Sequence, residues 1–169
     1  MSKGNILLLG IGGVVIVVLA AILILVPAPA EPKPDDGEVA EMPTVPEDIQ
    51  AHIDEMSDRI KVEQPMAMGV ISSPLLITGI ARGPWYFEAS FPVILTDWDG
   101  RIIAQSPAQA KGEWMTESFV PFEVTLEFEA PEDMGEFSRR GTLIFQKDNP
   151  SGLPEHDAAL EIPVLFDRT

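Results

Sequence analysis

Two hydrophobic patterns divide the chain. Residues 6–26, ILLLGIGGVVIVVLAAILILV, contain no charged or polar side chain. From Ile60 onward, apolar and polar residues alternate in short runs, as in PFEVTLEFEAP at 121–131. A continuous apolar run of that length is typical of a membrane-spanning helix, whereas alternation is typical of half-buried strands. The chain is therefore predicted to hold a membrane segment and a β-rich domain.

The apolar segment has the length of one membrane span. A helix over 6–26 would be about 30 Å long, which matches the hydrocarbon core of a bilayer. Lys3 precedes it and acidic residues follow it, so residues 1–5 are expected in the cytoplasm and the C-terminal domain outside the membrane. A cleaved signal peptide is the alternative, because Ala28-Pro29-Ala30 matches a cleavage pattern and cleavage there would release a secreted protein. The length of the segment favours a retained signal-anchor.

A linker and a short helix separate this segment from the β-rich domain. Residues 27–45 are rich in proline and acidic residues, as in a solvated, semi-extended spacer. Apolar residues then recur at helical spacing over 46–59, and Thr44 and Glu47 have the spacing of a capping box. We expect an amphipathic helix docked on the following domain, with His52 on its surface. Its apolar positions are Ile49, Ile53, Met56 and Ile60.

Runs of alternating residues continue to the C-terminus and are separated by turn-forming pairs such as Asp99-Gly100. About seven short strands with one apolar face indicate two packed sheets rather than one open sheet. We therefore expect an all-β sandwich over 60–169. The clearest runs are Ile60–Val62, Leu75–Ala81, Trp85–Thr96, Val120–Phe128, Leu143–Phe145 and Leu160–Phe166.

The stretch RGPWYFEASFPVILTDWDG, which begins at Arg82, is the densest in aromatic and charged side chains. Alternation predicts a central strand here, with Trp85 in the core. Tyr86 and Glu88 then lie on the solvent face, where Glu88 would pair with Arg82. Because Pro92 cannot donate a hydrogen bond to a ladder, we expect a bulge or a sheet edge at that position.

The overall charge and the lack of cysteine narrow the possible functions. The chain has 27 Asp and Glu against 11 Lys and Arg, and its formal net charge is −16. No basic stripe is visible in the sequence, so nucleic acid is not an expected partner. The absence of cysteine excludes disulfides, thiolate metal sites and a cysteine nucleophile.

The remaining patterns indicate turns rather than catalysis or metal binding. Asp97-Trp98-Asp99-Gly100 has part of the spacing of a calcium loop but lacks the further oxygen ligands that such a loop needs. His52 and His156 are too far apart to suggest a zinc site, and no serine stands in a nucleophile motif. We expect no enzyme activity, no cofactor and no metal, with a calcium-stabilised adhesin as an alternative.

Polar loops and aromatic residues outside the strands supply a candidate interaction surface. The loop over 147–152 is either an ordered hairpin-like loop held by Asp and Asn side chains or a recognition loop. Trp98 and Trp114 are candidates for an exposed platform that binds a sugar or a peptide. The full candidate set is Arg82, Tyr86, Glu88, Trp98, Trp114, Lys147, Asp148 and Asn149.

Several motifs in order resemble those of a known domain family. They are SPL at 73–75, ARG at 81–83, FEASFPV at 87–93, GEW at 112–114, KDNPSG at 147–152 and IPV at 162–164. Over about 60–166 the chain resembles the immunoglobulin-like domain named for bacterial spore-germination proteins. The resemblance implies an immunoglobulin-like sandwich in a membrane-attached envelope protein, and it carries no catalytic residues. The chain lacks the companion domain that such proteins often have, so the resemblance implies fold and location more than a process.

These inferences lead to one expected function and two alternatives. We expect a non-catalytic, membrane-anchored, extracytoplasmic module that binds another protein or assists an assembly in a bacterial cell envelope. A module that binds carbohydrate or peptidoglycan is the first alternative, and a calcium-stabilised adhesin is the second. The expected partners are the lipid bilayer, through 6–26, and an envelope protein or a cell-wall component.

Overall fold

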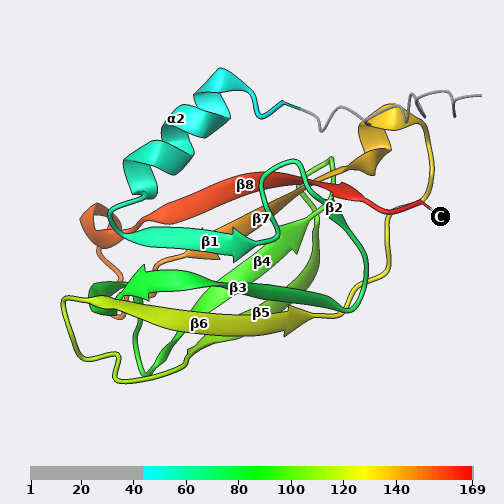
Figure 1. Ribbon diagram of the computed structural model, residues 1–169. Helices are drawn as coiled ribbons and strands as arrows, with labels where there is room; N and C mark the ends of the chain where they lie inside the picture. Colours follow the sequence, from blue (N-terminus) through cyan, green and yellow to red (C-terminus); the bar gives the residue numbers. More distant parts are fainter. Residues whose placement is uncertain (1–43, 169) are drawn as a thin grey trace, which may run out of the picture. The chain divides into compact units, whose positions relative to one another are not determined.

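A computed structural model describes residues 44–168, which form a curled β-sheet with one helix beside it (Figure 1). The elements are α2 (Glu47–Met56), β1 (Ile60–Gln64), β2 (Val70–Ile71), β3 (Leu75–Arg82), η1 (Gly83–Trp85), β4 (Ser90–Thr96), β5 (Ile102–Ala110), β6 (Phe119–Leu126), η2 (Glu136–Arg139), β7 (Arg140–Gln146), η3 (Pro154–His156) and β8 (Ala159–Phe166). The predicted membrane segment and most of the predicted linker lie outside the described residues. Within 44–168, no helix is long and apolar enough to cross a membrane.

All eight strands belong to one sheet, in the order β1-β3-β6-β5-β4-β7-β8-β2. The sheet curls so that β1, β3 and β6 lie over the strands of its other half (Figure 1). Only two residue pairs, Gln109 with Glu123 and Ala110 with Phe122, join β5 to β6 and connect the two halves. The arrangement is sandwich-like, as the alternation predicts, although a hydrogen-bonded link runs between the layers.

Aromatic rings from the two halves meet in the core. The rings of Phe91 on β4 and Phe122 on β6 have centroids 5.0 Å apart, and the Phe122 and Phe145 centroids are 6.1 Å apart. Trp85 and Tyr86 each contact Phe91 edge-to-face as well. Because edge-to-face contacts add to the burial of apolar area, this cluster holds the two layers together.

The predicted alternation is confirmed in five strands. In β3, β4, β6, β7 and β8 the apolar positions are buried and the positions between them are mostly exposed or half-buried. Two strands were not predicted, namely β2, which is two residues long, and β5. The β5 sequence IIAQSPAQA lacks the alternating large apolar residues of a core strand, and only Ala108 in it is buried.

Helix α2 docks on the sheet, as predicted. Met56 is buried, and Ile53 packs against the core. His52 is more than a surface residue, because its Nε2 accepts a hydrogen bond of 3.3 Å from the backbone N–H of Glu161 on β8. The predicted capping box is wrong, since Pro46 is the residue that precedes the helix and no side chain caps it.

The stretch from Arg82 to Thr96 is not one strand. The chain leaves β3, makes the turn η1 and then a tight hairpin, in which the backbone groups of Phe87 and Ser90 bond each other. Glu88 and Ala89 form this hairpin turn with φ values of 50° and 63°. Two positive φ values are typical of a type I′ turn, which usually contains asparagine or glycine. The sequence therefore contains no strong signal for it.

Pro92 lies in β4, which is a central strand rather than a sheet edge. It stands opposite Pro107 on β5, while the ladder between β4 and β7 begins one residue later, at Val93. The bulge in the ladder between β4 and β5 lies opposite Leu95 and Thr96, where β5 has the extra residue Ile103, and not at the proline. A central strand accommodates Pro92 because that position lacks a ladder to β7.

Candidate interaction surfaces

Most of the predicted surface residues gather at one end of the sandwich. We name this end, formed by η1 with residues 114–117 and the β7–β8 loop (147–158), the η1 end; it lies on the left in Figure 1. Hydrogen bonds hold these segments together: the backbone N–H of Asp148 donates to Trp85 O at 3.1 Å, and Arg82 Nη1 donates to Glu117 O at 2.9 Å. Arg82, Trp114, Lys147, Asp148 and Asn149 of the predicted set belong to it.

The Arg82 guanidinium is held by backbone carbonyls and by a ring. Besides Glu117 O, it donates through Nε to the carbonyl of Asp58, and it lies 4.6 Å from the centroid of the Phe119 ring. Lys61 Nζ lies 5.3 Å from the same centroid. The expected ion pair between Arg82 and Glu88 is absent from the described residues, because Glu88 lies in the hairpin turn.

The β7–β8 loop is ordered by its own side chains, as one of the two interpretations predicts. Asn149 Oδ1 accepts hydrogen bonds from the N–H and the hydroxyl of Ser151, and Asn149 Nδ2 donates to Leu153 O and to Asp157 Oδ1. Lys147 Nζ donates to His156 O at 2.8 Å. A loop braced in this way presents its side chains in fixed positions.

Tyr86 is not on the solvent face, which corrects the prediction. Only 4% of its surface is exposed, and its hydroxyl donates a hydrogen bond of 2.8 Å to Val120 O. The turn η1 shifts the alternation by one position, so that Tyr86 and Trp85 are both buried while Phe87 is exposed. Burial raises the pKa of the Tyr86 phenol well above its ordinary value of 10.0, because the charged phenolate would be poorly solvated.

This pKa shift predicts a loss of stability in alkali. Tyr86 is the sole tyrosine of the chain, so tyrosinate absorbance reports on it alone. The Tyr86 phenol ionises near pH 10 in the unfolded chain and at higher pH in the folded protein. The contribution of this group to the free energy of unfolding is therefore complete below pH 10, and above pH 10 it falls by up to about 1.4 kcal/mol per pH unit. Urea unfolding from pH 8 to 11 should show this fall in the wild type.

Tyr86→Phe is the control for that measurement. It removes the hydroxyl and should cost about 1 kcal/mol at neutral pH through the lost hydrogen bond to Val120. Its stability should then depend less on pH between 10 and 11 than that of the wild type. Identical pH profiles, or a folded tyrosine that ionises near pH 10, would contradict the assignment.

The two tryptophans of the predicted sugar platform lie at opposite ends of the sandwich. Trp114 is half-buried and borders a hollow with Pro84 and Tyr86, whereas Trp98 follows the far end of β4. The seven residues of β4 separate the two ends by about 20 Å, at about 3.3 Å per residue. One sugar ring therefore cannot contact both tryptophans.

Trp98 instead forms an exposed aromatic pair with Phe137 of η2. Their ring centroids are 4.9 Å apart, in an edge-to-face arrangement. The exposed fractions are 41% for Trp98 and 49% for Phe137. The sequence gives little signal for Phe137, because it stands in a short 3-10 turn inside a connection. We name these two residues the aromatic pair.

Polar contacts brace the turn that carries Trp98. The Asp97 carboxylate is buried: Oδ1 accepts from the N–H groups of Asp99 and Arg101, and Oδ2 accepts from Arg101 Nε at 3.1 Å. These contacts are those of a side-chain-stabilised turn. Within residues 44–168, no group of three His, Cys, Asp or Glu residues could hold a metal ion.

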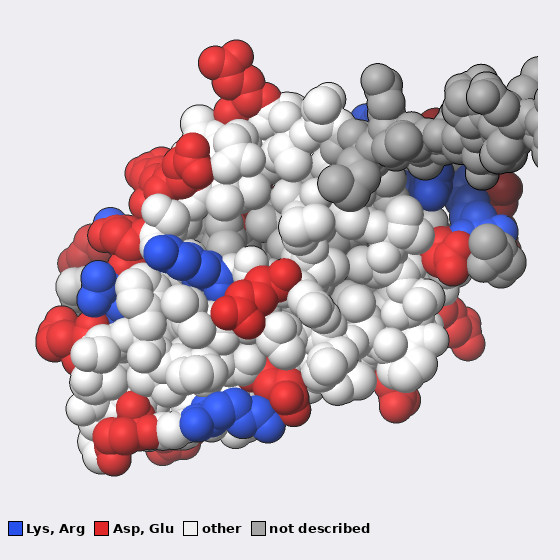
Figure 2. Space-filling view, viewed as in Figure 1, with Lys and Arg blue, Asp and Glu red and all other residues white. Residues whose placement is uncertain are grey.

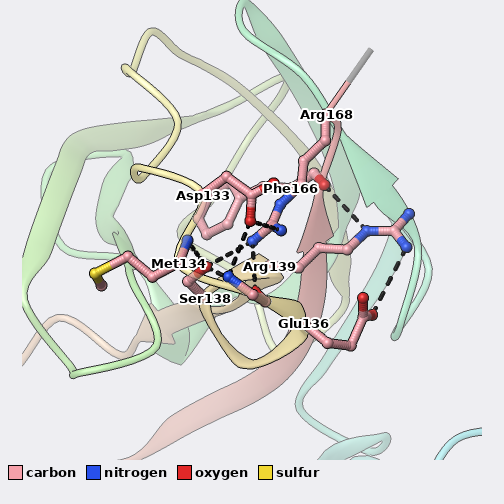
Figure 3. Close-up of polar contacts among 8 residues, drawn as sticks. Asp133, Met134, Glu136, Ser138, Arg139, Phe166 and Arg168 are labelled. Carbon is pink, nitrogen blue, oxygen red and sulfur yellow. Dashed lines mark hydrogen bonds and ion pairs between the residues drawn. The ribbon is translucent and has the colours of Figure 1, made fainter.

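A second network braces the segment that carries Phe137 (Figure 3). Arg168 bonds the Asp133 carboxylate through Nη1, and its Nη2 donates to Gly135 O at 3.0 Å and to Ser138 Oγ at 2.7 Å. The buried Ser138 hydroxyl in turn donates to Gly135 O and accepts from the N–H of Met134. The end of the chain thus fixes the β6–β7 connection.

An apolar groove of about 600 Å³ runs between α2, β1 and β8. Ile53, Val62 and Leu160 line it, together with the exposed side chains of Met66 and Val70. Figure 2 shows uncharged side chains over the middle of the visible face, with charged side chains gathered along its left side. None of the residues predicted as a candidate surface lines this groove.

The fold defines a sandwich-like β module, a curled eight-stranded sheet with ordered loops at both ends. The family model of the immunoglobulin-like domain of bacterial spore germination matches residues 59–151, which is more than half of the chain. The chain belongs to this family, and the resemblance seen in its motifs is confirmed. No curated protein and no solved structure matches the chain.

Proposed function

We propose that this protein is a membrane-anchored module that stands outside the cytoplasm and binds another protein of the cell envelope through the aromatic pair. The apolar segment 6–26 would supply the anchor, and the family supports a non-catalytic role. The observation that carries the proposal is the aromatic pair itself, Trp98 and Phe137, two large exposed rings that contact each other on two braced turns.

Exposed aromatic rings on rigid turns are suited to binding. Large apolar side chains at a surface contribute most of the free energy in many protein interfaces. Rings that are already held in position lose little conformational entropy when a partner covers them. The Asp97 contacts hold one ring and the Arg168 network holds the other, so both are positioned before binding.

Photo-crosslinking in the native cells tests this proposal. A photoreactive amino acid at position 99, beside Trp98, should join the full-length chain to one partner of defined mass. Trp98→Ala should reduce the adduct at least tenfold, because an aromatic hot spot contributes about 2 kcal/mol or more. Phe137→Ala should act in the same direction, since it removes the ring that supports Trp98.

Phe87→Ala is the matched control, because Phe87 is 41% exposed like Trp98 but follows η1 at the other end of β4. It should leave the adduct unchanged. Absence of any adduct from the otherwise wild-type chain would count against the proposal. Retention on purified cell wall that depends on Trp98, without a protein adduct, would favour the carbohydrate-binding alternative instead.

A further inference from the structure

Four basic side chains that are distant in sequence gather at the η1 end. Arg59, Arg82 and Lys147 line one hollow of about 340 Å³, together with Pro84 and Trp85. Lys61 joins them through the Phe119 ring, over which Lys61 and Arg82 both lie. We name Arg59, Lys61, Arg82 and Lys147 the basic cluster. Figure 2 shows basic side chains at this end of the molecule, on the left, with acidic side chains among them.

Carboxylates neutralise most of the other basic residues in the described part of the chain. Each of four has an Asp or Glu oxygen within 4.0 Å, in the pairs Arg101–Asp97, Lys111–Glu123, Arg139–Glu136 and Arg168–Asp133. These ion pairs leave little net positive charge where they stand.

Three of the four residues of the basic cluster lack such pairing. Among residues 44–168, no carboxylate lies within 4.0 Å of the charged atoms of Lys61, Arg82 or Lys147, and the Arg59 guanidinium is 3.8 Å from its chain neighbour Asp58. Arg82 and Lys147 donate to neutral backbone carbonyls. Carbonyls fix the positions of the cations but do not cancel their charge, so Lys61, Arg82 and Lys147 keep positive charges that no adjoining carboxylate neutralises.

We propose that the basic cluster binds an acidic side chain, Asp or Glu, of the partner protein. Arg82 donates through Nε and Nη1 to backbone carbonyls, and its Nη2 has no acceptor among the described residues. A carboxylate in the hollow would accept from Nη2 and from the Lys147 ammonium, and such charge-assisted hydrogen bonds are stronger than neutral ones.

The borders of the hollow favour a single carboxylate over a polyanion. Glu155 and Asp157 line it as well, and Asp148 stands in the same loop. These carboxylates would repel an extended chain of phosphates or acidic residues. The volume of about 340 Å³ is at the small end of the range for binding sites, and it is large enough for one acidic side chain.

Zero-length coupling on native membranes tests this inference with the full chain. Carbodiimide joins a carboxylate to an amine only when the two are in contact. The reaction should therefore link Lys147 or Lys61 to an Asp or Glu of one envelope protein, identified by mass spectrometry of the linked peptides. Lys147→Arg keeps the charge but removes the amine, so it should abolish the Lys147 link without abolishing binding at position 99.

Charge removal and a paired lysine supply the controls. Arg82→Gln leaves both amines in place and should lower the yield of linked partner at least fivefold. Lys111→Arg alters a lysine that is already paired with Glu123, and it should leave the yield unchanged. Circular dichroism of each purified variant checks that the fold persists.

Several results would overturn the inference. One is the absence of partner links at Lys61 and Lys147 when other lysines react, and another is an unchanged yield in Arg82→Gln. The link could instead join the cluster to an acidic residue of this chain's own 27–43 segment, to the C-terminal carboxylate of a partner or to a cell-wall peptide. Each of these results would show that the ligand is not an acidic side chain of a partner. The inference rests on the proposed function, because that function supplies the envelope partner. The two can fail separately: photo-crosslinking at position 99 tests the aromatic pair, whereas carbodiimide coupling tests the basic cluster.

Discussion

Phe91→Ala should lower the free energy of unfolding by about 4 kcal/mol, because it empties the centre of the aromatic core. The side chain is fully buried, and its ring contacts Trp85, Tyr86 and Phe122 from both halves of the curled sheet. The loss combines the transfer free energy of a large ring with the cavity that it leaves. Urea unfolding of the full chain in mild detergent, followed by tryptophan fluorescence, measures it.

Phe87→Ala provides the comparison for this loss. Phe87 is the same residue type only four positions away, but 41% of its surface is exposed. Its removal should change the free energy of unfolding by less than about 1 kcal/mol. Equal losses from the two substitutions would mean that Phe91 does not hold the layers together.

Gly83→Ala should also destabilise the fold strongly, by about 3 kcal/mol, because there is no room for a methyl group at this position. A Cβ on Gly83 would lie 1.8 Å from Thr116 O and 2.3 Å from Trp114 O. Both obstacles are backbone atoms, so either η1 or the segment 114–117 must move. The fluorescence of Trp114 should then shift to longer wavelength as the residue becomes more exposed.

The matched control is Gly112→Ala, two residues before Trp114. A Cβ on Gly112 would meet no atom within 4 Å. We therefore expect a change in stability within about 0.5 kcal/mol. If Gly83→Ala were equally neutral, the close packing of η1 against residues 114–117 would be wrong. Because Arg82 adjoins Gly83, the substitution should also reduce coupling at the basic cluster.

Most of the core was predictable because strand alternation depends on local sequence alone. The buried positions of β6, Val120, Phe122, Val124 and Leu126, are the apolar positions of an alternating run. The same holds for Leu160, Ile162 and Val164 in β8. A strand in which every second residue is apolar has one stable orientation in a sandwich, with its apolar face toward the core.

The errors fall at two turns that interrupt the alternation. The alternation places Tyr86 on the wrong face because η1 breaks it, although Gly83-Pro84 at the start of η1 is a pair typical of turns. Glu88 and Ala89 adopt positive φ without the glycine or asparagine that predicts it. The hairpin turn was therefore not visible in the sequence, whereas the turn at Gly83-Pro84 was.

The two candidate sites differ in how much of each the sequence revealed. Trp98 was predicted as a contact residue, but Phe137 was not, because the pair joins two separate connections. Of the basic cluster, Arg82 and Lys147 were predicted but Arg59 and Lys61 were not, since Arg59 and Lys147 are 88 positions apart in the printed sequence. A search for a basic stripe detects neighbours in sequence, whereas the fold brings these charges together in space.

The position of β1 in the sheet determines how the domain would respond to a mechanical load. β1 is an edge strand, and its ladder to β3 runs only from Ile60 to Gln64. Tension that enters the domain at residue 44 would reach α2 first, and then this ladder. The ladder would open one pair at a time from Ile60, at lower force than strands that must slide apart together. Under tension from an N-terminal tether, α2 and β1 would therefore detach first and lengthen the tether, while the remaining strands keep the aromatic pair in position.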